Sequence, residues 1–189
     1  MQSDTLHRQL CDFFRGCGRA VRVCAEQPAV RDMAERFERQ LGGFRTKDFA
    51  PRPIAALRHL EQVGDMRLAR DFQAFARRLP WRDSPLSADR GARIGVFELN
   101  DAFDMGAVTA GLLYVDAGAR CRQPDHAAQD LRFAVYFLIS GTARWRYGGS
   151  REYQSTPAGN VLCGPPRDMR GMIAGHTPSL SLYLQTAQL

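Results

Sequence analysis

The spacing of apolar residues changes near residue 90 of this 189-residue chain, and this change limits the folds it can adopt. Before that point apolar side chains recur every three or four residues, which is the period of an amphipathic helix. After it, short runs of aromatic and aliphatic residues are separated by turn residues such as Asn100-Asp101, Ser140-Gly141 and Gly148-Gly149. We therefore expect an α+β protein, with helices first and strands second.

The first part of the chain carries start and stop signals for several helices. Pro28 suits the first turn of a helix, Gly42-Gly43 suits a helix end, Asp65 can cap a helix, and Pro80 ends the last one. Residues 5–79 should be mostly helical, and the helices are expected over residues 6–24, 28–41, 53–60 and 65–79.

The second part contains seven short apolar runs, over residues 93–99, 107–115, 133–139, 143–148, 160–163, 170–173 and 179–185. Seven short strands at this spacing are typical of a closed barrel or a sandwich. We expect residues 93–185 to form this β structure. The predicted organisation is a helical N-terminal segment, residues 1–90, that packs on a β-barrel of residues 91–189.

Composition excludes several classes of function. The hydrophobic content is 44% and the charged content 24%, which is ordinary for a soluble protein. No apolar run reaches the roughly 20 residues that span a bilayer, and the first residues do not resemble a secretory signal, so a cytoplasmic location without a membrane partner is expected. The net charge of +6 comes from scattered arginines, so no nucleic-acid partner is expected. Five cysteines without a C-x-x-C pair predict neither a disulfide framework nor a zinc knuckle.

Several segments in a fixed order carry a family resemblance. They are RRLPW at residues 77–81, VYFLISGTARWRYGG at 135–149, PAGNVLCGPP at 157–166 and PSLSLYL at 178–184. This order resembles the cupin-type dimethylsulfoniopropionate (DMSP) lyases. The resemblance covers most of residues 75–185 and implies a helical N-terminal part followed by a cupin β-barrel, which is a double-stranded β-helix or jelly roll. It also implies a possible homodimer, because cupin barrels commonly pair through their sheets.

The resemblance further implies a chemistry. Enzymes of this family cleave DMSP to dimethyl sulfide and acrylate by β-elimination. A divalent metal (zinc, iron, manganese or nickel) holds the substrate carboxylate, and a tyrosine acts as the base. That tyrosine falls on Tyr136 of this chain.

The family's metal ligands fall on unsuitable residues. Its two histidines fall on Ala128 and Asp130, its glutamate on Ala134 and its last histidine on Arg170. A two-residue gap in the loop would instead supply His126. The candidate metal ligands are therefore His126 and Asp130, although both residue types are also common in solvated loops. Because selective sites need three or more donors and a guanidinium has no lone pair to offer, we expect metal to bind weakly or not at all.

Two functions from different classes remain open. One is a lyase that acts on a sulfonium carboxylate, with Tyr136 as catalytic residue. The other is a metal-free barrel that binds or senses a small organic acid; a structural or regulatory cupin dimer is a third. The candidate substrate-binding residues are Tyr136, Trp145, Tyr183 and Arg170. The aromatic residues could instead fill the core, and Arg170 could lie at the surface. If Arg170 instead points into the barrel, Asp168 on the same strand face could be its counter-ion in place of a ligand.

Overall fold

A computed structural model describes residues 2–42, 67–84, 94–122, 132–148 and 150–187. It contains helices α1 (Gln2–Cys24), α2 (Pro28–Gln40) and α3 (Arg67–Gln73). The ten strands are β1 (Arg82–Asp83), β2 (Ile94–Glu98), β3 (Val108–Val115), β4 (Arg120–Cys121), β5 (Phe133–Ser140), β6 (Thr142–Tyr147), β7 (Tyr153–Pro157), β8 (Val161–Gly164), β9 (Met169–Ala174) and β10 (Ser179–Thr186).

The helices confirm most of the helical pattern. In α1, Leu10, Cys17 and Val21 lie at helical spacing and are fully buried. α3 is shorter than expected and is followed by a separate 3-10 helix, Ala76–Arg78. Leu79 has extended backbone angles, φ −80° and ψ 148°, because a residue before proline is kept out of the helical region. The helix expected over residues 53–60 lies outside the described residues.

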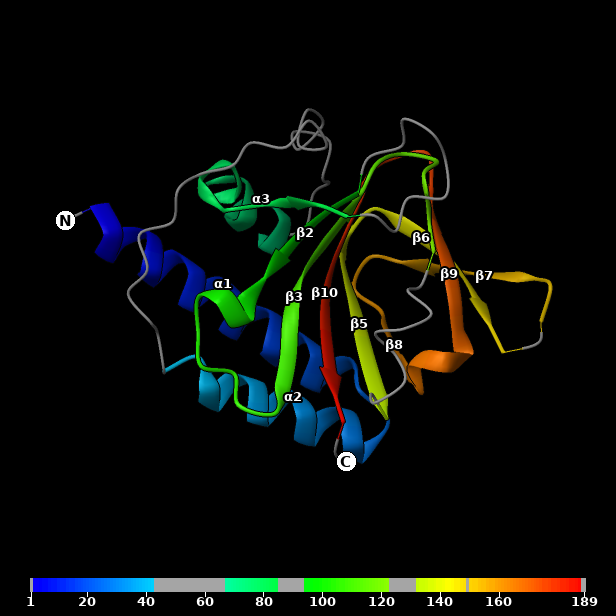
Figure 1. Ribbon diagram of the computed structural model, residues 1–189, viewed down its shortest axis with the longest axis horizontal. Coiled ribbons are helices and arrows are strands. Elements are labelled where there is room, and N and C mark those ends of the chain that lie inside the picture. The colour runs from blue at the N-terminus through cyan, green and yellow to red at the C-terminus, as the bar shows by residue number, and fades with distance from the viewer. Residues whose placement is uncertain (1, 43–66, 85–93, 123–131, 149, 188–189) are drawn as a thin grey trace.

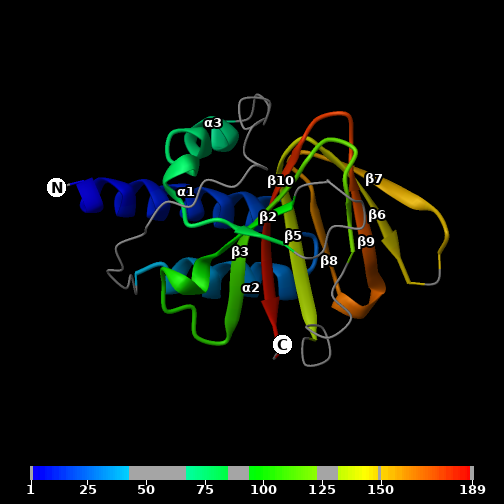
Figure 2. The same cartoon turned by 45° about the horizontal axis from the view of Figure 1, so that its top comes forward.

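The strands form two antiparallel sheets rather than one closed barrel. The order in the six-stranded sheet is β1-β2-β3-β10-β5-β8, and in the four-stranded sheet it is β4-β9-β6-β7. Among the described strands, the ladder of hydrogen bonds does not close, so the expected barrel is a two-sheet jelly roll. Figures 1 and 2 show α1 and α2 against one face of the six-stranded sheet and the smaller sheet on its other side.

The six-stranded sheet is therefore buried on both faces. Val135 and Phe137 of β5 belong to the core shared with the helices, whereas Leu138 belongs to the core between the sheets and Tyr136 packs against it. Alternation along residues 133–139 of the sequence predicts that Ala134, Tyr136 and Leu138 share one strand face, and Tyr136 and Leu138 do so. The core between the sheets, called the intersheet core below, consists of Ile94, Leu113, Val115, Ala119, Cys121, Leu138, Ala143, Trp145, Met172, Ala174 and Tyr183, with Val96, Tyr136, Tyr147 and Leu162 packed against it.

The structure adds three strands to the predicted seven, namely β1, β4 and β7. β1 and β4 have two residues each, and β7 is mostly exposed, so none shows a period of its own. The expectation that Asp168 shares a strand face with Arg170 is wrong, because Asp168 ends a 3-10 helix, Pro166–Asp168, just before β9 begins at Met169. A search of the described helices finds none long and apolar enough to cross a membrane.

Candidate functional site

Three of the predicted site residues meet in the intersheet core. Tyr136 comes from β5, Trp145 from β6 and Tyr183 from β10. The ring centroids of Tyr136 and Trp145 are 4.8 Å apart, and those of Tyr136 and Tyr183 are 6.5 Å apart. Trp145 and Tyr183 are buried, and Tyr136 is partly buried. The two sheets therefore build one aromatic cluster from residues that are distant in sequence.

Tyr183 is held by a carboxylate. Its hydroxyl donates a hydrogen bond of 2.6 Å to Oε2 of Glu98 on β2. The ring crosses the intervening strand β3 at Gly111, where an added Cβ would collide with the Tyr183 hydroxyl and with the carbonyl oxygen of Phe97. Gly111 therefore provides the space that allows this contact. Burial and the Glu98 charge raise the pKa of Tyr183 far above its ordinary value.

Tyr136, unlike Tyr183, accepts a hydrogen bond from a neighbouring side chain. Its oxygen accepts a bond of 3.2 Å from the Gln185 side-chain amide on β10. Burial raises the pKa of Tyr136 to about 12, while the Gln185 hydrogen bond acts to lower it. Within the described part of the chain, no group accepts a hydrogen bond from the Tyr136 hydroxyl, so this hydroxyl is available to donate one to a ligand.

The intersheet core also contains unpaired polar atoms. Nε1 of Trp145 and Oγ of Ser181 are buried without a hydrogen-bond partner among the described residues. Ser181 is on the same face of β10 as Tyr183, because Leu180, Leu182 and Leu184 face the helices. A buried unpaired donor is costly, and a bound ligand with a hydrogen-bond acceptor would remove that cost.

The described donors do not fit the metal that the fold family implies. Ala134, at the position of the family's glutamate, is fully buried beside Gly164 and offers no lone pair. Burial raises the pKa of the Cys121 thiol to about 12, and the Glu98 carboxylate is occupied by Tyr183. No three histidine, cysteine or acidic side chains cluster at metal-binding distance in the described ranges. His126 and Asp130 lie outside those ranges, so weak metal binding stays a prediction.

The backbone of Arg170 is in β9, where the pairing with β6 shifts register between Arg146 and Tyr147. Met169 is paired with Tyr147 and Gly171 with Arg146, so Arg170 is the residue at this irregularity. Its side chain is outside the described part of the structure. A carboxylate-binding role for Arg170 is therefore taken up below as a proposal.

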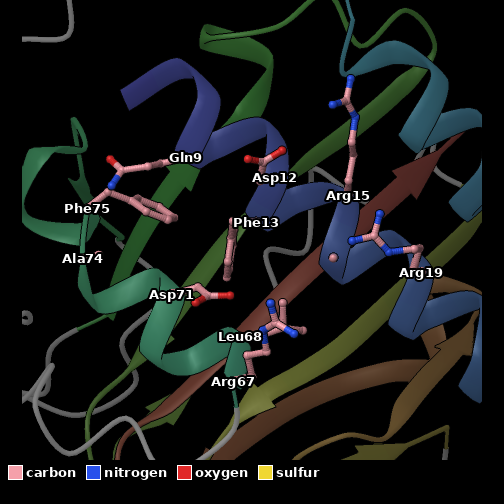
Figure 3. A pocket seen from close by; sticks show the side chains of 11 residues that line it. Gln9, Asp12, Phe13, Arg15, Arg19, Arg67, Leu68, Asp71, Ala74 and Phe75 are labelled. Atoms are coloured by element: carbon pink, nitrogen blue, oxygen red, sulfur yellow. The ribbon is translucent and has the colours of Figure 1, made fainter. Parts of the chain in front are cut away.

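The structure also has a cavity among the helices, and its lining includes none of the three aromatic residues of the cluster. This cavity of about 590 Å³ is between α1 and α3. Figure 3 shows its walls, with Asp12 and Arg15 on α1 and Arg67 and Asp71 on α3. These four charged side chains are exposed, so water solvates them and nothing buried selects a ligand. The intersheet core is the stronger candidate site.

Two residues of the site were missed at the level of sequence. Glu98 shares its strand face with Ile94 and Val96, so a charge on an inward-facing position was the available signal. Gln185 lies two residues after Tyr183 and shares its face in the same way.

Comparison with solved structures agrees with this architecture. The DMSP lyase DddQ from Ruegeria pomeroyi superposes with a TM-score of 0.67 at 18% identity, over 98% of this chain and 93% of that one. The chain has the fold of the cupin-type DMSP lyases. A second match, from structures of the DMSP lyases RdDddP and RnDddQII, has a TM-score of 0.52 at 20% identity and covers 89% and 93% of the two chains.

These two superpositions establish the fold of this chain, and the resemblance inferred from sequence is confirmed at that level. No protein-family model and no curated protein matches the sequence. Any activity of this protein therefore has to be argued from its own residues.

Proposed function

We propose that the intersheet core binds a small sulfonium carboxylate and that the protein is a carbon–sulfur lyase of the DMSP type. The observation that carries this proposal is the cluster of Tyr136, Trp145 and Tyr183, with an available Tyr136 hydroxyl and an unpaired Trp145 Nε1 in the same core. Aromatic faces attract a sulfonium, and the indole N–H is a donor for a carboxylate oxygen.

In the proposed reaction the Tyr136 oxygen, in its ionised form, takes the proton α to the carboxylate. The electron pair of that C–H bond forms the carbon–carbon double bond of acrylate. The C–S bond breaks, and its pair leaves with the sulfur as dimethyl sulfide. A bound sulfonium a few ångströms from Tyr136 favours its ionised form, since opposite charges stabilise each other in a buried site. No step is assigned to a metal, because the described donors do not fit one.

The test is a direct assay of the purified protein with DMSP. We expect dimethyl sulfide in the headspace and acrylate in solution, in equal amounts, at a rate above that of a protein-free sample. The assay is run on protein isolated without chelator and again with zinc, iron, manganese or nickel added. Absence of both products under all of these conditions would exclude the lyase function.

A second function, metal-free binding of a small organic acid, is favoured by Ala134. This buried residue removes a donor at the family's glutamate position, while Arg170 replaces the last histidine. An arginine fork matches the two oxygens of a carboxylate and needs no metal. In this alternative, Arg170 grips the carboxylate and Tyr136 donates a hydrogen bond to it. A homodimer stays a prediction under both functions.

Arg170→Met tests the grip on the carboxylate. With acrylate or propionate at about 100 times Kd, the melting temperature of the wild type should rise by about 5–10 °C through mass action. The shift should disappear in Arg170→Met and be smaller in Arg170→Lys, which keeps the charge but not the fork. Differential scanning fluorimetry measures it. The control is Arg144→Met, which removes an exposed arginine from β6. Equal shifts in wild type and Arg170→Met would show that Arg170 does not bind the acid.

A further inference from the structure

In the intersheet core, the hydroxyl of Tyr183 donates a hydrogen bond to its partner, and the hydroxyl of Tyr136 accepts one from its partner. Tyr136 and Tyr183 are directly paired across β5 and β10. The Tyr183 hydroxyl donates a hydrogen bond of 2.6 Å to the Glu98 carboxylate, whereas the Tyr136 oxygen accepts a hydrogen bond of 3.2 Å from the Gln185 amide. Neighbouring groups of the same chemical type are thus placed in environments that favour different protonation states.

The contact with Glu98 keeps Tyr183 protonated. Ionisation would remove the hydrogen bond and put two negative charges 2.6 Å apart in a buried site. Burial is the largest cause of its raised pKa, and the charge and hydrogen bond of Glu98 add to it. Tyr183 is therefore a poor base, although it lies next to the residue for which that role is proposed.

The hydrogen bond from Gln185 acts to lower the pKa of Tyr136, whereas Glu98 raises that of Tyr183. An amide N–H that donates to the oxygen stabilises the phenolate, and it leaves the hydroxyl proton free. The described titratable groups facing Tyr136 are Cys121 from β4, Tyr147 from β6 and Tyr183 from β10. Burial raises the pKa of each of these three groups, so each is neutral near neutral pH.

We infer that Gln185 is a positioning residue that holds the Tyr136 oxygen ready to take a proton from a bound ligand, and that Glu98 keeps Tyr183 as its proton-bearing neighbour. The hydrogen bonds alone assign Tyr136 as the proton acceptor and Tyr183 as the protonated neighbour. That Tyr136 takes the proton in an elimination reaction rests on the proposed function. In that reaction, Gln185 acts through its hydrogen bond to Tyr136.

The order in which the tyrosines ionise tests this inference without any assay of activity. The chain has five tyrosines, so protein grown with 3-fluorotyrosine should give five fluorine resonances. Fluorine makes the hydroxyl more acidic and brings ionisation into an accessible pH range. Resonances are assigned with Tyr136→Phe and Tyr183→Phe and followed from neutral to alkaline pH. We expect Tyr136 to ionise before Tyr183. Ionisation of Tyr183 first would overturn the inference.

Variants of the two partners sharpen the test. Gln185→Leu should raise the pKa of Tyr136 by about one and leave Tyr183 unchanged, since a hydrogen bond to the charged form is lost. Gln185→Glu keeps the shape but removes the donor and should shift Tyr136 in the same direction. Glu98→Gln should lower the pKa of Tyr183 only. An equal pKa of Tyr136 in the wild type and in Gln185→Leu would contradict the role of Gln185.

Turnover is a separate readout. If the wild type cleaves DMSP, its kcat should rise as pH rises through the pKa of Tyr136, because the ionised oxygen is the base. The rise should move to higher pH in Gln185→Leu by the amount seen in the fluorine titration. If Tyr136 ionises before Tyr183 but the protein does not cleave DMSP, the lyase function is excluded and the inference about the two tyrosines stands. If the protein cleaves DMSP but Tyr183 ionises before Tyr136, the lyase function stands and Gln185 has no role in its mechanism.

Discussion

Tyr136→Phe is expected to lower the release of dimethyl sulfide from DMSP by about 10²–10⁴-fold, the usual contribution of one positioned base. The substitution removes only the hydroxyl. The ring that lies 4.8 Å from Trp145 stays, so the aromatic cluster should keep its packing. The loss should appear in kcat more than in KM, because the hydroxyl acts on the proton that moves in the transition state. Headspace gas chromatography across a range of substrate concentrations measures both constants.

Tyr153→Phe is the matched control for this change. Tyr153 is 37% exposed at the start of β7, outside the intersheet core. It undergoes the same chemical change and should retain the full rate. If Tyr136→Phe and Tyr153→Phe were equally active, Tyr136 could not be the base. Circular dichroism of both variants should match the wild type, because losing the single bond from Gln185 costs only about 1 kcal/mol.

Trp81→Ala is expected to lower the free energy of unfolding by about 3–5 kcal/mol. Trp81 is 1% exposed and lies between the helices and the six-stranded sheet. Its ring centroid is 5.9 Å from Phe72 of α3 and 6.2 Å from Phe97 of β2. Its indole Nε1 donates a hydrogen bond of 2.7 Å to the carbonyl oxygen of Ala76. The substitution leaves a cavity at the contact between the two layers and removes the indole hydrogen bond, while the backbone N–H of Leu79 still donates to the Ala76 oxygen at 3.3 Å.

Urea denaturation followed by circular dichroism measures this loss. Domains of this size are stable by only about 5–15 kcal/mol, so the midpoint should fall to a much lower urea concentration. Val23→Ala is the control, because Val23 is apolar but 86% exposed and should change stability by less than about 0.5 kcal/mol. A loss below about 1 kcal/mol in Trp81→Ala would mean that Trp81 does not join the helices to the sheet.

Local patterns predicted a large part of this fold. Helical spacing in the first forty residues matches α1 and α2, and the alternation in β5 places Tyr136 on the face opposite Val135 and Phe137. Both patterns depend only on the geometry of a single element, so they can be read from neighbouring residues. β1 and β4 were missed because two residues show no period, and they are strands only through their partners β2 and β9.

The sequence by itself determined the order of helices and strands, the inward face of the Tyr136 strand and the absence of a side-chain carboxylate at Ala134. The tertiary structure alone decided which polar groups meet. Tyr183 and Glu98 are 85 residues apart, and Gln185 and Tyr136 are 49 apart. Such pairs form only when strand order and register bring β10 between β3 and β5, with Gly111 leaving room for the Tyr183 hydroxyl. Register is set by the packing of whole sheets, and no short segment of sequence contains that information.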